Sequence, residues 1–468
     1  MTDIYDVAII GAGVVGAAVA RELAQYELRC VLIEAADDVG TGTSKANTAI
    51  LHTGFDAKPG YLEARLVQRG YKLLKAYAEQ AGIPVEPIGA LLVAWEEDQL
   101  AALSGIQEKA RQNGVFDVEF IAVDELYRRE PKLGAGALGA LEVPGESIIC
   151  PFTPPLAYAT QAVINGVALR LNSPVQAVER VADEYFIRCP QETFRCRYLV
   201  NAAGLHSDTI NRMLGHEEFG VIPRRGELIV FDKMARGLVD HILLPVPGKM
   251  GKGVLISPTV FGNVMLGPTA ENLTDRTATD TTAQGIASLL EKGRRILPDL
   301  LNEEVTATYA GLRASTEHDD YQIHLHEEER YLCLGGIRST GLSASLAIAE
   351  YAAERLAEAG LELRRKAEFK TVKMPNLGEA FPRPYQSEEM IRQNADYGRI
   401  VCHCERVTRG EIVDAANAVI AARSFDALRR RTRAQMGRCQ GFFCSAEVAA
   451  LLAEATRLRV ETLIGAAL

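Results

Sequence analysis

The sequence predicts an α/β and α+β protein with three parts: a Rossmann-like domain, an inserted antiparallel sheet and a small helical C-terminal module. Three observations carry this prediction. A strand, a glycine turn, a helix and a second strand follow one another between Asp6 and Glu34. Short alternating strands separated by glycine turns begin near Val221. A proline-containing stretch then precedes a segment with four clustered cysteines.

The N-terminal stretch reads DVAIIGAGVVGAAVARELAQYELRCVLIE. Gly11 suits the tight turn, Gly13 lets a pyrophosphate approach the backbone, and Gly16 lets the helix pack closely on the strand. The free N–H groups and the dipole at the helix start favour phosphates. Glu34, at the tip of the second strand, can accept the hydroxyls of an adenosine ribose. We therefore predict a dinucleotide site here, with an ordinary glycine turn as the alternative.

The bulk composition limits the class of protein. With 468 residues the chain has room for about three domains. The net charge of −10 argues against general nucleic-acid binding. We find no apolar run long enough to span a membrane, and the first strand begins so early that we expect no signal peptide. Nine cysteines in such a chain indicate a reducing compartment.

Hydrophobic periodicity predicts the elements that follow. Amphipathic helices are expected over residues 62–80, 97–113 and 152–165, and a long helix over 342–360. Strands are expected over residues 88–95, 167–178 and 198–204. From these patterns we infer a discontinuous nucleotide domain (residues 1–80, 140–215 and 310–360) and a substrate domain inserted into it (residues 81–139 and 216–309).

The composition changes again after residue 360. Residues 361–398 carry basic residues and then prolines, which is typical of a linker. Residues 399–468 form the cysteine-containing module, and we expect its segment from Gly410 to Ala434 to be helical.

The motifs resemble known families. GTSKANTAILHTGFD, NAAG, PRRGE, GKGVLISP, GPTAEN, GLRAS and GIRSTGLSASLAIAE are similar to the glycine- and D-amino-acid-oxidase-like FAD superfamily, over about residues 4–360. Within it the chain most resembles bacterial FAD-dependent glycerol-3-phosphate dehydrogenases and oxidases. The end of the chain resembles the bacterioferritin-associated-ferredoxin-like (BFD-like) 2Fe–2S domain.

The resemblance implies FAD as the dinucleotide and extends its site beyond the glycine fingerprint. The expected contacts come from the fingerprint and from four later segments. They are Gly11, Gly13, Val14, Val15, Gly16, Glu34, Gly42, Thr43, Ser44, Asn47, Val175, Ala203, Gly204, Gly336, Gly341, Leu342 and Ser343. The helix that begins near Leu342 would direct its positive dipole at the flavin, where reduced flavin carries negative charge.

The resemblance also implies catalytic and substrate-binding residues. His52 would lie near the reactive face of the flavin, where an imidazole can take a hydroxyl proton near neutral pH. Arg313 would hold an anionic substrate and help catalysis. Arg225, Lys252, Arg338 and Ser339 are expected to bind the same anion. One departure concerns Arg338: the chain reads GIRSTGL where the family pattern is nearer GIESPGL, which adds a positive charge beside the expected flavin site.

The C-terminal cysteines form a metal-binding pattern. Cys402 and Cys404 make a CxC pair, and Cys439 and Cys444 make a CxxxxC pair. Four thiolates can hold a 2Fe–2S cluster, and zinc is the alternative metal. The long match to the BFD-like domain favours iron and sulfur.

Three functions are compatible with these motifs. The first is oxidation of sn-glycerol 3-phosphate to dihydroxyacetone phosphate, with hydride transfer to FAD and electron export through the cluster. The second is oxidation of an L-2-hydroxy acid, such as 2-hydroxyglutarate, or of an amine by the same flavin chemistry. The third is a non-catalytic electron-transfer or scaffold subunit. We expect an electron-accepting partner subunit or a quinone, and a cytoplasmic protein with at most peripheral membrane contact.

Overall fold

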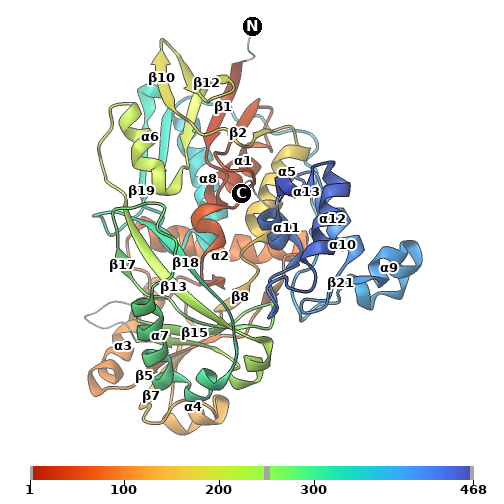
Figure 1. The fold of residues 1–468 in the computed structure, drawn as a ribbon. Coiled ribbons are helices and arrows are strands. Elements are labelled where there is room, and N and C mark those ends of the chain that lie inside the picture. Colours follow the sequence, from red (N-terminus) through yellow and green to blue (C-terminus); the bar gives the residue numbers. More distant parts are fainter. Residues whose placement is uncertain (1–3, 247–252, 464–468) are drawn as a thin grey trace.

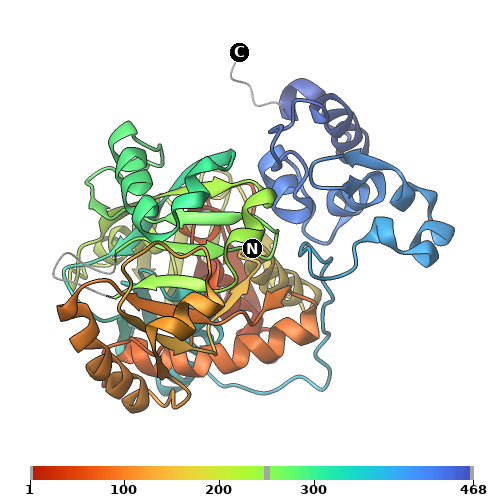
Figure 2. The same ribbon diagram turned by 90° about the horizontal axis from the view of Figure 1, so that it is seen from below.

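The computed structural model describes residues 4–246 and 253–463. It consists of a body with two large β-sheets and one small three-stranded sheet, and a smaller helical module beside it (Figure 1). Viewed from below, the module stands to one side of the body, and an extended segment leads to it (Figure 2). Among the helices of the described ranges, none combines the length and the apolar composition that a bilayer crossing requires.

The first sheet builds the nucleotide domain. Its central strand β1 (Ile4–Ile10) lies between β12 (Thr193–Asn201) and β2 (Cys30–Ile33), and β9 (Ala168–Arg170) follows β2; all of these pairs are parallel. Strand β20 (Tyr331–Gly335) pairs parallel with the end of β12, and β19 (Gln322–His326) flanks β20. This is the Rossmann-like arrangement predicted from the glycine fingerprint.

Helices cover this sheet and fill its core. Helix α1 (Val14–Leu23) packs against α5 (Thr153–Ile164) and α8 (Gly341–Glu358), and α2 (Leu62–Ala81) packs on α8. The segment 167–178, expected as one strand, forms β9 and then β10 (Ala177–Val181). Asn172, with φ of 53°, and Pro174 interrupt the strand between them.

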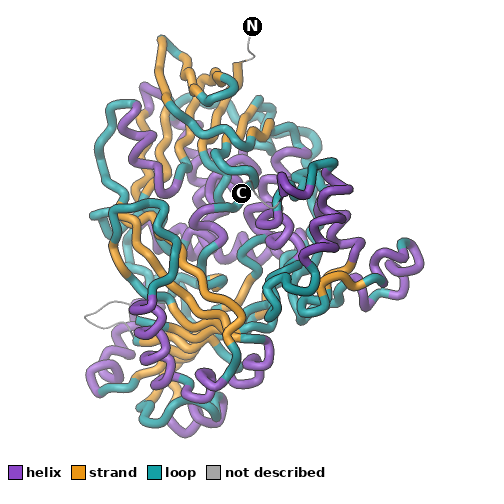
Figure 3. The backbone as a smooth tube through the Cα atoms, viewed as in Figure 1, coloured by secondary structure: helices purple, strands orange, loops and turns teal. Residues whose placement is uncertain are grey.

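The second sheet builds the substrate domain and forms the lower group of strands in Figure 3. Its order is β17 (Glu271–Asn272), β13 (Ile222–Phe231), β16 (Val264–Gly267), β15 (Leu255–Pro258), β14 (Ile242–Pro245), β5 (Ala90–Ala94), β7 (Gly139–Val143) and β6 (Glu119–Ile121). Strand β18 (Val305–Ser315) pairs along β13. Thus β18 stays in this sheet beyond residue 309, where the domain boundary was expected.

The prediction of an antiparallel sheet needs one correction. Strands β14 and β5 run parallel, with Ile242 opposite Ala90. They come from the two separate segments of the substrate domain, so a long connection through the nucleotide domain joins them. Such a connection permits parallel pairing, and an alternating sequence pattern does not report strand direction.

Residues 361–398 do not form a free tether. Lys366 donates its backbone N–H to the Gln25 carbonyl at 2.8 Å, and Met374 donates to the Ala81 carbonyl at 2.7 Å. Glu379 donates to the Val260 carbonyl at 2.8 Å. The segment therefore runs along both domains of the body as a hydrogen-bonded strap. The linker composition predicted irregular structure, which residues 361–383 have, but it indicated neither this attachment nor the short helix α9 (Glu388–Gln393) that follows.

The C-terminal module contains a short hairpin, β21 (Ile400–Cys402) and β22 (Val407–Thr408), and the helices α10 (Arg409–Asn417), α11 (Phe425–Thr432), α12 (Ser445–Thr456) and α13 (Val460–Leu463). The expected helical segment from Gly410 to Ala434 is two helices. The first ends at Ala418, which adopts an extended backbone. The second begins where the Ser424 hydroxyl accepts the N–H of Ala427, a stabilising N-cap.

Candidate functional site

A cavity of about 1280 Å³ opens between the two sheets. Predicted cofactor contacts line one part of it, and basic residues line another. The predicted residues on its wall are Gly13, Val14, Val15, Thr43, Ser44, Asn47, His52, Gly204, Arg225, Arg313, Gly336, Arg338, Ser339, Gly341 and Leu342. Residues far apart in the sequence therefore meet at one site.

The glycine turn has the geometry that a dinucleotide requires. Gly11 has φ of +100°, and a Cβ there would lie 2.5 Å from the Ala202 carbonyl oxygen. A Cβ on Gly16 would lie 1.8 Å from the Gly11 carbonyl oxygen, so only glycine lets helix and strand pack this closely. Gly13 faces the cavity, and its bare backbone leaves room for a phosphate beside the start of α1.

Two side chains order the walls of this turn. Ser44, in the short helix Gly42–Lys45, accepts the N–H of Val14 through Oγ at 2.9 Å. The Asn47 side chain donates to the Ser44 carbonyl at 2.8 Å. The loop that should continue along the cofactor is thus held directly to the first turn of α1.

Glu34 lies behind the turn. Its Oε2 accepts the Ala12 N–H at 2.6 Å, and Oε1 accepts the Ala36 N–H at 2.9 Å. Burial raises the pKa of this carboxyl above its usual range. Glu34 is not on the cavity wall, so its contact with a ribose stays a prediction.

Other predicted cofactor residues lie near the cavity but support it from behind. Ser343 is fully buried, and its hydroxyl accepts the backbone N–H of His52 at 2.8 Å. Ala203 donates its N–H to the buried Asn201 side chain at 3.2 Å. Val175 packs against the apolar cluster that includes Ile33 and Ile187, as its residue type alone predicts.

His52 forms a pair with Glu146. Its Nδ1 lies 2.8 Å from Glu146 Oε2, while Oε1 of the same carboxylate accepts the N–H and the hydroxyl of Thr53 at 2.7 and 2.9 Å. Glu146 is fully buried, whereas His52 lines the cavity. A carboxylate at Nδ1 favours the tautomer with the proton there, in which Nε2 carries no proton. Sequence reasoning missed Glu146 because it stands in an ordinary loop after Pro144.

Two arginines face each other across the cavity wall. In the β13–β18 ladder, Arg224 stands directly opposite Arg313, and both line the cavity. Neither guanidinium forms an ion pair or a hydrogen bond with another residue in the described ranges. Burial, and then the charge of Arg224, lower the pKa of Arg313 to about 10. Like charges in this position are destabilising unless an anion lies between them.

Arg225 lines the cavity as well, but its guanidinium already has partners within the protein. Its guanidinium lies 2.6 Å from Glu271 Oε2 and donates to the Asp280 carbonyl at 3.2 Å. Successive residues of a strand point to opposite faces, so Arg224 and not Arg225 shares the face of Arg313. A Cβ on Gly226 would lie 2.8 Å from Arg313 Nη2, so this glycine makes room for the guanidinium.

The remaining predicted anion ligands are less directly placed. Arg338 contacts the carbonyl of Asp319, and its Nη2 lies 3.5 Å from Glu63 Oε2. Ser339 is exposed at the cavity wall. Lys252 lies outside the described residues.

The four cysteines of the C-terminal module come together in two pairs. The Cys404 and Cys439 thiols contact each other, and so do Cys402 and Cys444. The backbone amides of Phe443, Gly441 and Phe442 surround the Cys439 sulfur, and the first of these contributes most to lowering its pKa. Two pairs of soft ligands beside backbone donors suit a 2Fe–2S cluster.

Comparisons with known proteins agree with this geometry. Residues 6–355 match the FAD dependent oxidoreductase family, and residues 400–454 match the BFD-like 2Fe-2S binding domain. The chain is 38% identical to a glycerol 3-phosphate dehydrogenase of Caloramator mitchellensis, over 96% of this chain and 94% of that protein. It is 29% identical to the human mitochondrial L-2-hydroxyglutarate dehydrogenase, over 58% of this chain and 61% of that protein.

A solved structure gives the same result for the body. The FAD-bound L-alpha-glycerophosphate oxidase of Mycoplasma pneumoniae superimposes with a TM-score of 0.75 at 28% identity, over 80% of this chain and all of that one. The predicted fold class, FAD and the 2Fe–2S cluster are thereby confirmed. The chain belongs to the FAD-dependent oxidoreductase family and carries a BFD-like 2Fe–2S binding domain after its catalytic body.

Proposed function

We propose that this protein oxidises sn-glycerol 3-phosphate to dihydroxyacetone phosphate. The pair of arginines, Arg224 and Arg313, is the observation that carries the proposal. Their charges face one cavity without a described counter-ion, and a phosphate dianion can accept from both guanidinium groups. The similarity to a glycerol 3-phosphate dehydrogenase and a glycerophosphate oxidase supports the same substrate.

In this proposal His52 takes the proton from the substrate hydroxyl. The Glu146 carboxylate contacts Nδ1, so Nε2 is the nitrogen that takes the proton. The same carboxylate stabilises the positive charge that the imidazole ring then gains. FAD, when bound, supplies the acceptor for the hydride that leaves the carbinol carbon. Oxidation thus removes one proton and one hydride from the alcohol, which leaves the ketone.

The cysteine module serves as the outlet for electrons. Cys402, Cys404, Cys439 and Cys444 would hold a centre that carries one electron at a time. A centre of this kind suits transfer to a partner subunit or a quinone, because a flavin that reacts directly with oxygen does not need it.

An anaerobic titration tests the substrate. The FAD-loaded protein is mixed with glycerol 3-phosphate, glycerol, 2-hydroxyglutarate or sarcosine, and bleaching of the flavin band is followed. We expect glycerol 3-phosphate to bleach the flavin at concentrations at least ~10-fold below glycerol, since losing one charge-assisted contact weakens binding by about 1.5–3 kcal/mol. Faster bleaching by 2-hydroxyglutarate or sarcosine would replace the proposed substrate. No bleaching by any compound would favour a non-catalytic subunit.

A further inference from the structure

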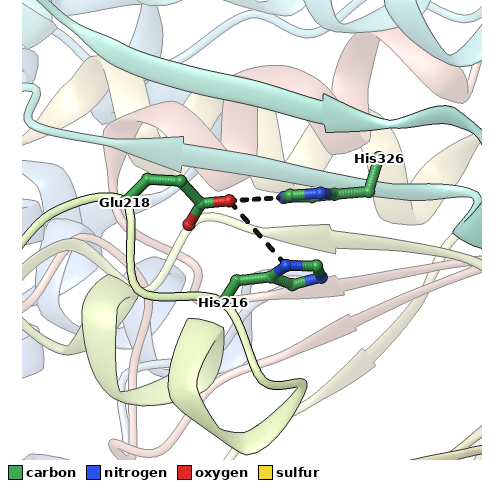
Figure 4. Close-up of side chains that lie close together, drawn as sticks. All are labelled: His216, Glu218 and His326. Carbon is green, nitrogen blue, oxygen red and sulfur yellow. Dashed lines mark ion pairs between the residues drawn. The ribbon is translucent and has the colours of Figure 1, made fainter.

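A cluster of histidines and carboxylates lies at the outer edge of the nucleotide domain. His216 and Glu218 stand in the loop after α6 (Ser207–Met213), and His326 is the last residue of the edge strand β19. Their side chains converge on one point (Figure 4). None of the three lines the flavin cavity. The cluster is therefore separate from the site described above.

The distances within the cluster fit ligands of a shared metal ion. His326 Nε2 lies 3.1 Å from Glu218 Oε1, and His216 Nδ1 lies 3.8 Å from the same oxygen. Ligand atoms about 2.0–2.1 Å from a tetrahedral zinc ion lie roughly 3.4 Å apart. The two observed separations bracket that value, and all three candidate ligand atoms lie within 4.8 Å of one another.

His326 provides the strongest single observation. Its Nε2 is buried and makes no hydrogen bond, although Glu218 Oε1 is near. This nitrogen thus has an ion-pair contact but no hydrogen bond, and a buried nitrogen without a hydrogen bond is costly. Two ligands that both point at an ion also approach each other without a hydrogen bond between them.

The surroundings resemble the outer shell of a metal site. His216 Nε2, the nitrogen that faces away from Glu218, lies 2.9 Å from Glu329 Oε2. Metal-bound histidines usually donate their second N–H to a carboxylate in this manner. The two imidazole rings stack with 3.6 Å between centroids, and both also stack near Tyr331. Packing thus fixes the orientation of the rings.

We propose that His216, Glu218 and His326 bind a divalent transition-metal ion of the zinc class, with water as the fourth ligand. Two imidazoles and one carboxylate suit zinc and its neighbours better than calcium or magnesium. The ion would join the α6 loop to the edge strand. It would also steady Tyr331, whose hydroxyl accepts from the buried Asn201 beside the NAAG turn.

Cobalt titration of the holoprotein tests this site. With FAD and the cluster in place the four cysteines of the C-terminal module are occupied, and the other five are buried in the body, so Co²⁺ should bind with one ion per chain. The visible spectrum should show d–d bands of nitrogen and oxygen ligands without thiolate charge-transfer bands. Zinc should displace the cobalt and raise the Tm of the body. Thiolate bands, or no binding at submillimolar Co²⁺, would overturn the proposal.

Matched variants make the test specific. Glu218→Gln and His326→Gln should each weaken Co²⁺ binding at least tenfold, and Glu329→Gln should weaken it less, as expected for an outer carboxylate. His241→Gln removes another histidine that is paired with a glutamate and should leave the Co²⁺ affinity unchanged. Tm without metal shows whether each variant is folded. Unchanged Co²⁺ affinity in folded Glu218→Gln and His326→Gln would place the ion elsewhere.

Discussion

Two of the histidine–glutamate pairs in the described part of the chain have nearly the same geometry but lie in different places. His52 Nδ1 lies 2.8 Å from Glu146, and His241 Nδ1 lies 2.7 Å from Glu130. Both carboxylates are almost completely buried, and both also accept backbone N–H groups, from Thr53 in one pair and from His241 itself in the other. Of these two histidines, His52 lines the flavin cavity and His241 does not.

Comparing the two pairs separates the structural role of a histidine–glutamate pair from the catalytic role that a position beside the cavity allows. In both places a buried carboxylate fixes the ring orientation and satisfies neighbouring amides, which is a structural role. Proton transfer needs in addition a reacting group within hydrogen-bond reach. A histidine–carboxylate pair by itself therefore identifies no active site, and the cavity distinguishes His52 from His241.

The largest expected effect comes from the two histidines. His52→Asn should slow flavin reduction by about 10²-fold or more, the usual size of a general-base contribution. His241→Asn should leave the rate unchanged within a factor of two, because His241 contacts no part of the cavity. Anaerobic stopped-flow absorbance at the flavin band measures both rates.

The outcome for this pair of variants is decisive in either direction. FAD content and far-UV circular dichroism must match the wild type in both proteins. Equal rates in the two variants would remove His52 from the mechanism and would make the two pairs functionally equivalent.

The arginines of β13 and β18 provide a second matched set. Arg224→Ala and Arg313→Ala should each weaken glycerol 3-phosphate binding roughly 10- to 150-fold, the equivalent of about 1.5–3 kcal/mol for a contact with a charged group. Arg225→Ala should weaken it much less, because this guanidinium is bound to Glu271. The concentration for half-maximal flavin bleaching measures the effect. A larger loss for Arg225→Ala than for Arg224→Ala would reverse our assignment of the strand faces.

The glutamates of the two pairs, Glu146 and Glu130, can be compared through the free energy of unfolding. Glu146→Gln and Glu130→Gln each convert charge-assisted hydrogen bonds to neutral ones, at a cost of about 1–3 kcal/mol in the free energy of unfolding. Urea unfolding of each FAD-loaded variant should show similar losses. Flavin reduction should slow only in Glu146→Gln. Slowing in both variants would indicate that general destabilisation, and not orientation of His52, affects the rate.

Much of the fold and part of the site could be predicted from the sequence. The glycine turn was predicted correctly because the signal is local: each glycine meets a structural requirement within one strand–turn–helix unit. The cysteine pairs were readable for the same reason. For the anion site, Arg313 and Arg225 stay predictions, and both line the cavity. Arg224 was not considered, because the four residues after Glu227 in β13 are all apolar and do not reveal which face meets the cavity.

Contacts between distant segments were the hardest to predict. Three features depend on tertiary packing: Glu146, the His216–Glu218–His326 cluster and the strap of residues 361–398. Their local sequences contain no motif that predicts these contacts. Asp38 is the clearest case. It follows the dinucleotide acid in a short polar loop, yet it is buried between Arg430 and Arg431 of the C-terminal module.

Asp38 also offers the smallest expected effect on catalysis and extends the comparison to a buried carboxylate paired with arginine. Arg431 Nη1 and Nη2 lie 2.6 Å from its two oxygens, and Arg430 Nη2 lies 2.5 Å from one of them. Burial alone would raise the pKa of this carboxyl, but the two guanidinium groups outweigh it and hold the pKa below the ordinary value. The joint between body and module therefore depends on an ionised carboxylate.

The sign of the pH dependence follows from that pKa. Because the docked pKa lies below the pKa of a free aspartate, near 3.9, the stabilisation is complete at neutral pH. It fades only as the pH falls below about 4. Asp38→Asn should loosen the module already at pH 7, since it leaves buried Arg431 without a carboxylate and Arg430 with only the half-exposed Asp426. Leaving one partner of a buried ion pair uncompensated typically costs about 3–5 kcal/mol. Small-angle X-ray scattering should show a larger radius of gyration for this variant, while flavin reduction by substrate stays within twofold of wild type. Lys45→Ala is the control, because its ion pair with Asp426 is exposed and contributes little. A compact Asp38→Asn protein would show that the strap, and not the buried ion pair, holds the module in place.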